Sequence, residues 1–409
     1  MGQQDYNIDE KNIRGDNMNV YLDHSATTYV DEDVLEAMMP YFHDHFGNAS
    51  SQHTLGQEAM NAVDRAREAV AKAINARPSE IYFTSGGTES DNWAIKGIAH
   101  AYASEGKHII TSAVEHHAVL HTCEQLTKEG YEVTYVPVHP SGEVDLDALK
   151  AAIRPDTVLI SVMYANNEIG TIQPIEEIGR IAKEHKIFFH TDAVQAMGVC
   201  DIDVKAQNID LLSMSAHKFY GPKGVGVLYI RNGVKPDKLI IGGAQERSMR
   251  GGTYNTPGIV GCAAALTKAI AHREENNAKI AALRDYFVEQ VKARIPYIVI
   301  NGGFEHRLPN NANISFLYVE GESILLSLDL EGIQASSGSA CSSGSLDPSH
   351  VLLATGLPVE NAHGSIRFSF GKDNTKEQVD YTLEVLERTI ARLREWSPLY
   401  ADLKKSKEN

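Results

Sequence analysis

Residues 157–191 read TVLISVMYANNEIGTIQPIEEIGRIAKEHKIFFHT. The stretch opens on a continuous apolar run, Thr157–Met163, which has the length and composition of a buried strand. Pro174 suits the start of a helix, because its missing N–H would have no partner there, and we expect the helix over Ile175–Glu184. A second apolar strand is expected at Ile187–Thr191. A strand, a helix and a second strand in this order predict parallel strands with a helix packed across them.

The same alternation extends in both directions from this stretch. Strands are expected at 81–84, 108–111, 132–138, 211–215 and 224–230, and helices at 55–74, 90–101, 115–128 and 145–153. The predicted fold class is therefore α/β, with a mainly parallel seven-stranded sheet covered on both faces.

The pattern changes after Pro257, where a long helical stretch runs to about Ile295 in more than one piece. Strands and helices no longer alternate strictly beyond it, which indicates a smaller α+β domain. We expect an N-terminal extension at 1–20, a large cofactor-binding domain at 21–268 and a small C-terminal domain at 269–409.

Composition narrows the function classes. The 409 residues include 38 Lys and Arg against 54 Asp and Glu, so the formal net charge is −16. This balance disfavours nucleic acid and anionic membranes as partners, and no apolar run is long enough to span a bilayer. The N-terminus lacks the apolar core of a secretory signal. Four cysteines without close spacing argue against disulfides and metal sites, so we expect a reducing cytoplasm.

Three segments together indicate a cofactor. The turn Thr84–Ser90 (TSGGTES) follows a strand and opens a helix, so Gly87 and Thr88 could hold a phosphate, although a plain N-cap explains them as well. Asp192 follows a predicted parallel strand, where ligands bind, but alone it reads as a helix cap. Lys218 leaves an apolar strand into a Gly/Pro turn, where desolvation makes an amine nucleophilic; a surface lysine is the alternative. A phosphate site, an acid for a ring nitrogen and a reactive lysine are what pyridoxal 5'-phosphate requires.

Other side chains have weaker signals. His116 could stack on the cofactor or shuttle a proton, whereas His117 and His121 have helical metal-ligand spacing but no convincing third ligand. Cys341 lies in SSGSACSSGS, a composition typical of an exposed loop, and is the candidate reactive thiol. The other cysteines, Cys123, Cys200 and Cys262, are expected to be spectators. Arg367 could bind a carboxylate, although a solvent-facing strand residue is the simpler interpretation.

At this point the chain resembles a known family. YLDHSATT, GNASSQH, SGGTESDN, EHHAV, ANNEIG, HTDAVQ, SAHKFYGPKG, RGGT and SSGSAC together look like a cysteine desulfurase of the NifS/IscS type, over about residues 18–400. That family belongs to the class V aminotransferase-like, fold-type I pyridoxal phosphate enzymes.

The resemblance implies roles for matching positions. Lys218 would carry the cofactor covalently, Asp192 would bind its ring nitrogen, and His116 would stack on the ring and move protons. The other implied cofactor contacts are Gly87, Thr88, Asn167, Gln195, Ser215, His217 and, from the partner subunit of a homodimer, Thr253. Asn167 and Arg367 would bind the carboxylate of L-cysteine. Cys341 would be the nucleophile that becomes a persulfide, from which an acceptor such as an iron–sulfur scaffold protein takes the sulfur.

Alternatives stay open at this point. The chain could be a selenocysteine lyase or another class V enzyme, and Cys341 discriminates because transamination needs no loop thiol. A non-catalytic sulfur-relay protein is disfavoured by intact Lys218, Asp192 and His116. A dehydrogenase is disfavoured because the dinucleotide-binding fingerprint is missing. No resident metal is expected, although transient contact of Cys341 with an iron–sulfur cluster is left open.

Overall fold

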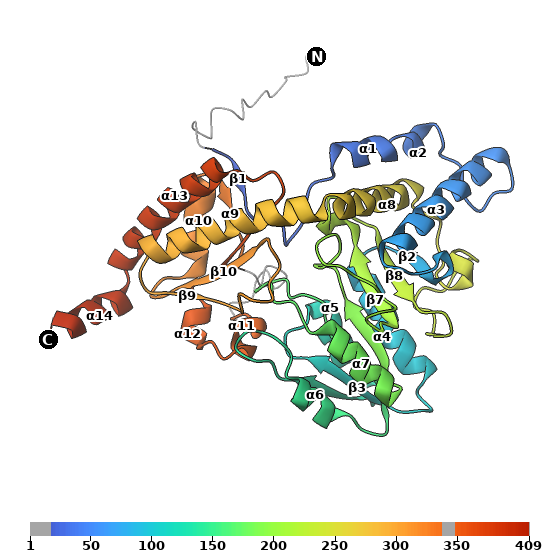
Figure 1. Cartoon of the computed structure of the whole chain (residues 1–409), viewed down its shortest axis with the longest axis horizontal. Coiled ribbons are helices and arrows are strands. Elements are labelled where there is room, and N and C mark those ends of the chain that lie inside the picture. The colour runs from blue at the N-terminus through green and yellow to red at the C-terminus, as the bar shows by residue number, and fades with distance from the viewer. Residues whose placement is uncertain (1–17, 338–347, 409) are drawn as a thin grey trace, which may run out of the picture.

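The computed structural model describes residues 18–337 and 348–408, and its larger part is built on one central sheet (Figure 1). The strand order is β2 (Ile81–Thr84), β8 (Gly226–Ile230), β7 (Leu211–Ser215), β6 (Phe188–Asp192), β5 (Thr157–Ser161), β3 (His108–Ser112) and β4 (Glu132–Val136). β8 runs antiparallel to both of its neighbours, and every other pairing in this sheet is parallel. The predicted seven-stranded, mainly parallel sheet is confirmed.

Helices cover both faces of this sheet because successive strand residues point to opposite sides. Leu211 and Leu228 pack in one cluster with Trp93 of a covering helix, whereas Leu212 and Val227 belong to the cluster on the other face. The first face is covered by α4 (Gly87–Ala101) and α5 (His117–Lys128). The second is covered by α3 (Thr54–Ala73), α6 (Leu146–Ala152), α7 (Ile175–His185) and α8 (Thr256–Ala271), with α1 (Glu32–Met38) and α2 (Pro40–His43) outside α8.

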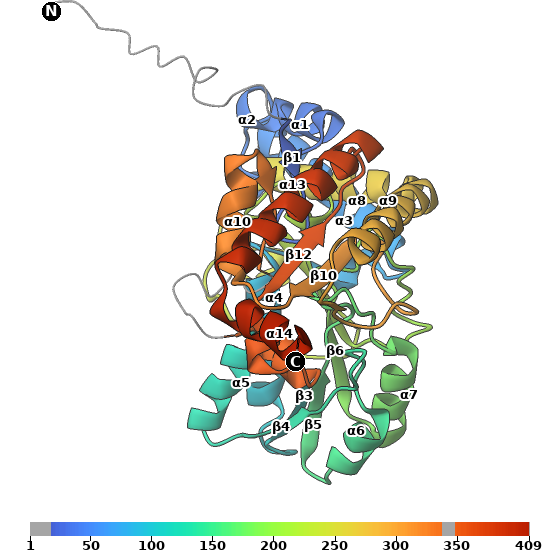
Figure 2. The ribbon, with the colours of Figure 1, turned by 90° about the vertical axis from the view of Figure 1, so that its left-hand side faces the viewer.

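A smaller sheet forms the second part of the molecule. Its antiparallel order is β12 (Ser365–Ser369), β10 (Asn311–Phe316) and β9 (Ile298–Ile300). Around it lie α9 (Arg273–Arg294), α10 (Gly321–Leu330), α13 (Lys376–Glu395) and α14 (Pro398–Glu408) (Figure 2). Two short helices, α11 (His350–Ala354) and α12 (Val359–Ala362), precede β12, and Val351 and Leu352 of α11 pack with Val114 and Met163 of the larger part. A separate hydrophobic cluster holds α9, α10 and α13 against these strands.

The N-terminal strand joins this smaller part. β1 (Val20–Tyr21) pairs in parallel with β11 (Ile333–Gln334), and Val20 and Leu22 lie in the hydrophobic cluster of the smaller part.

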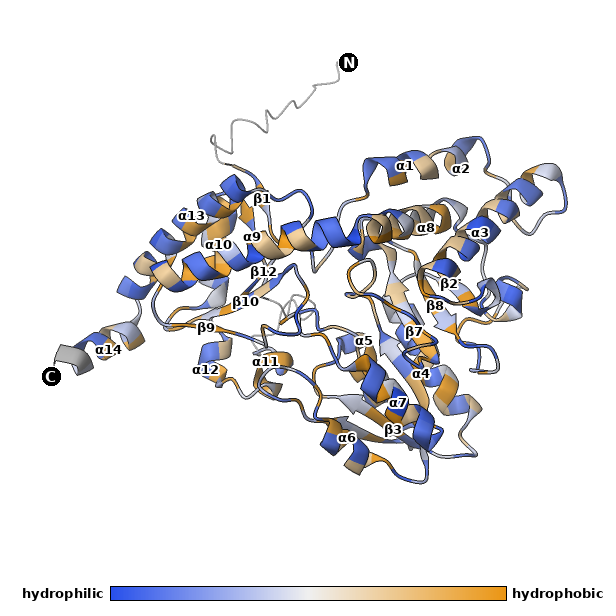
Figure 3. Cartoon of the chain, viewed as in Figure 1, coloured by the Kyte–Doolittle hydropathy of each residue, from blue (hydrophilic) through white to orange (hydrophobic). Residues whose placement is uncertain are grey.

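The domain division at residue 268 stays a prediction. The helical stretch near that division is in more than one piece, as predicted, and its two helices, α8 and α9, meet at His272. Polar residues are concentrated where α9 begins (Figure 3). Among the helices of residues 18–337 and 348–408, none is both long and apolar enough to cross a bilayer.

The ends of several strands of the large sheet lie close together along one edge, beside the first residue of β8. Thr84 of β2 and Ser215 of β7 pair with the same residue, Gly226 of β8, so the loops that follow them start close together. A Cβ on Gly226 would lie 2.6 Å from the Cα of Gly86. Glycine is therefore required at 226 for the turn before α4 to approach the end of β7.

Candidate active site

A cavity of about 360 Å³ lies at this edge of the sheet. It is lined by Ser25, Ala26, Gly87, Thr88, Asp91, His116, Met163, Ala165, Asn167, Asp192, Val194, Gln195, Ser215, His217, Lys218 and Arg367. Among the predicted site residues, Thr253 is exposed and does not line it, and Cys341 lies outside the described residues. All the others meet in this single cavity.

One end of the cavity suits an anion. Helix α4 begins at Gly87, three residues earlier than the sequence pattern predicted, and among the described residues no side chain caps its first N–H groups. These donors and the positive end of the helix dipole therefore face the cavity beside the hydroxyls of Thr88 and Ser215. His217 adds a ring whose Nδ1 lies 3.1 Å from Thr27 Oγ1. Burial, followed by the nearby Lys218, lowers the pKa of His217 to about 4, so its ring is neutral at pH 7.

Buried carboxyl groups form the floor. Asp192 ends β6, and its Oδ1 accepts a hydrogen bond from the Val194 N–H at 2.9 Å. Asp91, one turn into α4, is fully buried near it. Burial raises the pKa of both carboxyl groups, and their mutual repulsion adds to the rise for Asp91. A protonated ring nitrogen in the cavity would offset this cost.

The floor is supported by a neutral histidine. His190 lies between Ser161 Oγ (2.8 Å from Nδ1) and Ser213 Oγ (3.0 Å from Nε2), and burial lowers its pKa to about 3. Its Nε2 is 3.6 Å from Asp91 Oδ1, which accepts no hydrogen bond among the described residues. Two buried carboxyl groups facing a cavity, one of them with an oxygen that accepts no hydrogen bond among the described residues, fit a cationic group as a further partner.

Lys218 sits in the short 3-10 turn Ala216–Lys218 directly after β7. Its Nζ donates hydrogen bonds to the carbonyl oxygens of Ser25 (2.6 Å) and Ala26 (2.7 Å). Gln195 Nε2 also donates to the Ser25 carbonyl, at 2.9 Å. The segment after β1 therefore holds the lysine over the cavity from a part of the chain nearly 200 residues away.

His116 caps helix α5. The sequence pattern predicted that this helix begins at Glu115, whereas it begins at His117. The Nδ1 of His116 accepts a hydrogen bond from the Ala118 N–H at 3.1 Å, so in the neutral ring the proton is on Nε2. Burial, followed by the neighbouring His117 and Lys218, lowers the pKa of His116 to about 4. The ring is neutral at pH 7 and can exchange a proton on the cavity side.

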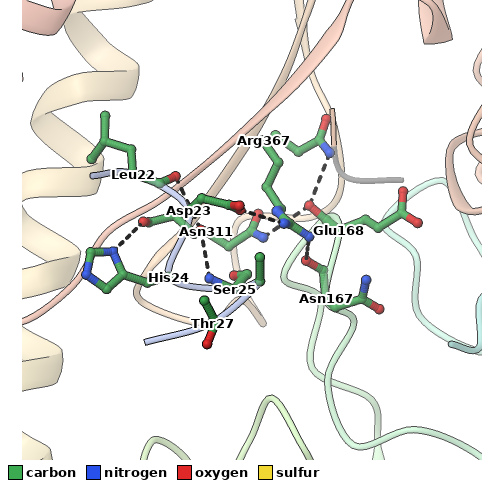
Figure 4. A network of polar contacts seen from close by, with 12 residues as sticks. Leu22, Asp23, His24, Ser25, Thr27, Asn167, Glu168, Asn311 and Arg367 are labelled. Carbon is green, nitrogen blue, oxygen red and sulfur yellow. Dashed lines mark hydrogen bonds and ion pairs between the residues drawn. The ribbon is translucent and has the colours of Figure 1, made fainter. Parts of the chain in front are cut away.

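Arg367 reaches the cavity from β12 of the smaller sheet (Figure 4). Its Nη2 donates to Asp23 Oδ1 at 2.7 Å, and its Nη1 donates to the backbone carbonyl of Asn167 at 3.0 Å. The guanidinium is thus buried, paired with Asp23 and fixed in orientation at the wall of the cavity.

The two other histidines of the segment that holds His116, His117 and His121, and the cysteines Cys123, Cys200 and Cys262 do not line the cavity. The rings of His117 and His121 stack with centroids 5.0 Å apart, and among the described residues no group of three His, Cys, Asp or Glu is arranged to hold a metal ion. Burial raises the pKa of the thiols of Cys123, Cys200 and Cys262 to about 12, so they are unreactive at neutral pH.

Sequence reasoning missed several parts of the cavity. Ser25 and Ala26 contact Lys218 through their backbone carbonyls, which every residue type has, so the side chains alone could not identify them. Both residues fall within the quoted motif YLDHSATT. Asp91 could have been found from its spacing, since it lies four residues after Gly87 on the same helix face. The residues present fit pyridoxal phosphate: uncapped N–H groups for its phosphate, buried acids for its ring nitrogen and a lysine for its aldehyde.

Comparison with known proteins identifies the family of the chain. A family model described as Aminotransferase class-V matches residues 20–382. A protein of Clostridium botulinum named Cysteine desulfurase IscS is 57% identical over 394 residues, covering 96% of this chain and 99% of that protein. A protein of the same name from Methanosarcina thermophila is also 57% identical, covering 96% and 97%.

Solved structures show the same likeness. One described as a NifS-like protein has 42% identity and a TM-score of 0.87, covering 92% of this chain and all of that one. Another, described as SspA in complex with cysteine, has 40% identity and a TM-score of 0.78, covering 87% and 100%. The chain belongs to the class-V aminotransferase family and, within it, to the cysteine desulfurases of the NifS/IscS type. The fold and the family expected from the sequence motifs are confirmed.

Proposed function

We propose that this chain binds pyridoxal 5'-phosphate in the cavity and removes sulfur from L-cysteine, giving L-alanine and a persulfide on Cys341. The observation that carries the proposal is the meeting of Lys218, the buried acid Asp192 and the uncapped start of α4 in one cavity. When bound, pyridoxal phosphate supplies a protonated ring that withdraws electrons from the substrate carbon joined to it.

The residues of the chain divide the remaining work. The N–H groups at Gly87, with Thr88, Ser215 and His217, hold the phosphate end, and Lys218 anchors the aldehyde end. Asp192 would keep the ring nitrogen protonated, and Asp91 is buried close to Asp192. Gln195, already oriented by the Ser25 carbonyl, contacts the ring oxygen.

The substrate side requires orientation and proton transfer. Arg367 and Asn167 bind the carboxylate of L-cysteine and so orient the substrate in the cavity. His116 is neutral at pH 7 and lines the cavity, so it would contact the ring and exchange a proton through Nε2.

The sulfur step balances as a displacement. The Cys341 thiolate attacks the substrate sulfur, so a sulfur–sulfur bond forms while the carbon–sulfur bond breaks. The electron pair of the broken bond stays with carbon, which takes up a proton, and alanine leaves. A thiol reductant or an acceptor thiol then removes the sulfur from Cys341.

We further propose a homodimer in which Thr253 of the partner subunit completes the phosphate site. Thr253 is exposed in the single chain. The side chains of Met39, Phe42 and Phe46, near the start of the chain, are more than half exposed, which favours burial against another copy.

The acidic net charge favours a protein as sulfur acceptor, such as an iron–sulfur scaffold. Because the persulfide must cycle with free thiol, a reducing cytoplasm suits the reaction.

Activity of the purified protein tests the proposal. We expect L-cysteine to yield alanine and, with a thiol reductant present, an equal amount of sulfide. Cys341→Ala should abolish the release of both, whereas the matched variant Cys200→Ala should retain it. Full alanine production by Cys341→Ala would contradict the assignment of the nucleophile and favour another class V activity, such as selenocysteine lysis.

A further inference from the structure

A groove of about 330 Å³ lies between α4 and α5, which pack side by side (Figure 1). α4 contributes Thr88, Asn92 and Lys96, spaced four residues apart, and α5 contributes His117 and His121 with the same spacing. Residues four apart lie on one face of a helix. The groove is therefore walled by one polar face of each helix.

The charge of this groove differs from that of the whole chain. The chain has a formal net charge of −16, yet no Asp or Glu is among the described residues that line the groove. Lys96 supplies an ammonium group, and His116, His117 and His121 supply imidazole rings. A hollow lined only by basic and neutral groups attracts anions.

The basic side chains have no partners that would use up their hydrogen-bond donors. Within residues 18–337 and 348–408, Lys96, His117 and His121 form no hydrogen bond and no ion pair. The Nδ1 of His117 is buried and unpartnered among these residues, which is costly unless another molecule contacts it. The acids Glu124 and Glu129, on the same helix, act on the histidine and lysine groups only from outside the groove.

The imidazole rings are crowded together. The centroid of the His117 ring lies 5.0 Å from that of His121, on which it stacks, and 5.0 Å from that of His350 in α11. Burial, followed by His350 and His121, lowers the pKa of His117, and the charge of Glu124 offsets this only in part. The rings thus disfavour one another's protonation. An anion among them would offset this repulsion and stabilise the protonated rings.

The donors in the groove indicate the chemistry of the ligand. Lys96 and Asn92 project from α4, and the rings of His117 and His121 project from α5. The Asn92 Nδ2 donates to the Thr88 carbonyl at 3.0 Å and has a second N–H to donate. Donors that converge from two walls suit a ligand with acceptor oxygens in several directions, as in a tetrahedral oxyanion.

We propose that the groove between α4 and α5 binds a tetrahedral oxyanion, held by Lys96, His117 and His121. The ligand is a free sulfate or phosphate ion or the phosphate end of a small metabolite. The site is independent of the proposed function, because it requires neither Cys341 nor L-cysteine. Thr88 and His116 line both this groove and the active-site cavity, so the bound anion lies beside the active site.

Calorimetric titration of the holoenzyme with sodium sulfate tests the site, with the ionic strength held constant by sodium chloride. We expect a dissociation constant of about 1 mM at pH 6 and binding about tenfold weaker at pH 8, because protonated imidazole rings bind an anion more strongly. Titrations in two buffers with different heats of ionisation should show that protons are taken up on binding.

A second ligand distinguishes the two sources of the anion. Glycerol 3-phosphate presents the same tetrahedral group at the end of a small organic molecule. Tighter binding of glycerol 3-phosphate than of sulfate would assign the groove to the phosphate end of a metabolite. Equal or weaker binding would assign it to the free ion.

Variants locate the bound ion. Lys96→Gln and His121→Gln each keep a polar side chain in the helix but remove an ammonium group or a ring, so each should weaken sulfate binding at pH 6 by about fivefold or more. His121→Gln should also reduce the proton uptake. Lys128→Gln, at an exposed lysine in the last turn of α5 that does not line the groove, is the matched control and should bind sulfate as the unmodified protein does.

Three results would overturn the inference. The first is no measurable binding of sulfate at concentrations about a hundredfold above the expected dissociation constant. The second is equal affinity at pH 6 and pH 8. The third is unchanged affinity in both Lys96→Gln and His121→Gln, which would place the ion elsewhere, for instance beside Arg367. Failure of the proposed function would leave all three measurements unaffected, since none of them depends on turnover.

Discussion

The floor of the cavity and its Arg367 side are assembled in different ways. The floor comes from consecutive strands of the large sheet: Asp192 ends β6 and Lys218 follows β7, so their positions follow from parallel pairing. The Arg367 side comes from the smaller sheet, where Arg367 is held by Asp23 and Asn167, which lie 344 and 200 residues away in sequence.

Because they are assembled differently, we expect the two sides to have different roles. The floor holds buried, charged groups that a cofactor would neutralise, and it has the rigid support of the central sheet. On the Arg367 side, Ser336 exchanges backbone hydrogen bonds with Arg367, Ser349 donates a hydrogen bond to Glu168, and we propose that this side binds the substrate. We therefore expect changes on the floor to abolish the chemistry, and changes on the Arg367 side to alter substrate affinity or sulfur transfer by smaller factors.

The largest effect should come from Lys218 on the floor. Lys218→Ala removes the amine that attaches the cofactor, so activity should fall by a factor on the order of 10³ or more. The absorbance of bound cofactor and its retention after borohydride reduction measure this directly. Lys223→Ala, at an exposed lysine on the same turn, is the matched control. Covalent cofactor in Lys218→Ala would contradict the assignment.

A smaller loss is expected at His116. Asn is a good helix N-cap, so His116→Asn keeps the start of α5 while it removes the proton-transfer group. The kcat for alanine formation should fall about a hundredfold. Helical content and melting temperature should be nearly unchanged. Activity within about threefold of the unmodified protein would show that His116 serves only as a cap.

Arg367→Lys tests the other side. Lysine keeps the charge but loses the fork that spans Asp23 and Asn167. The KM for L-cysteine should rise about tenfold, corresponding to about 1.4 kcal/mol, with a smaller change in kcat. Arg388→Lys, at an exposed ion pair with Glu331, provides the control. An unchanged KM would remove Arg367 from substrate binding.

The smallest effect concerns Glu115. Its carbonyl oxygen lies 2.9 Å from Nε2 of His350. Its Oε1 accepts from the Ser112 hydroxyl and from the Met163 N–H at 3.0 Å, and burial raises its pKa to about 8. The folded state thus holds a proton that the unfolded chain releases near pH 4.3. Stability from this group is full below that pH and is lost as the pH rises toward 8.

Glu115→Gln should remove this pH dependence. Between pH 5 and 8, the free energy of unfolding of the unmodified protein should decline relative to that of the variant by at most about 1.4 kcal/mol per pH unit. Urea unfolding of the holoenzyme at pH 5.5 and 8 measures the difference. Parallel curves for the two proteins would mean that the carboxyl group is ionised in the fold.

The comparison of the two sides also explains what the sequence could predict. Strand ends, glycine turns and the charged residues beside them are local patterns, so Gly87, Thr88, Asp192 and Lys218 were recognisable. The carbonyls of Ser25 and Ala26 were not, because any residue supplies a carbonyl. The ion pair between Asp23 and Arg367 and the hydrogen bond between Glu168 and Ser349 depend on packing between distant segments, which no local pattern encodes. Thr253 in a partner subunit and Cys341 as nucleophile stay predictions.

The central claim is that sulfur moves from L-cysteine to Cys341. The most direct measurement is mass spectrometry of peptides from the holoenzyme after one turnover with L-cysteine, without reductant. We predict that the peptide containing Cys341 gains the mass of one sulfur atom and that peptides with Cys123, Cys200 and Cys262 do not. Formation of alanine with no added sulfur on Cys341 would contradict the account.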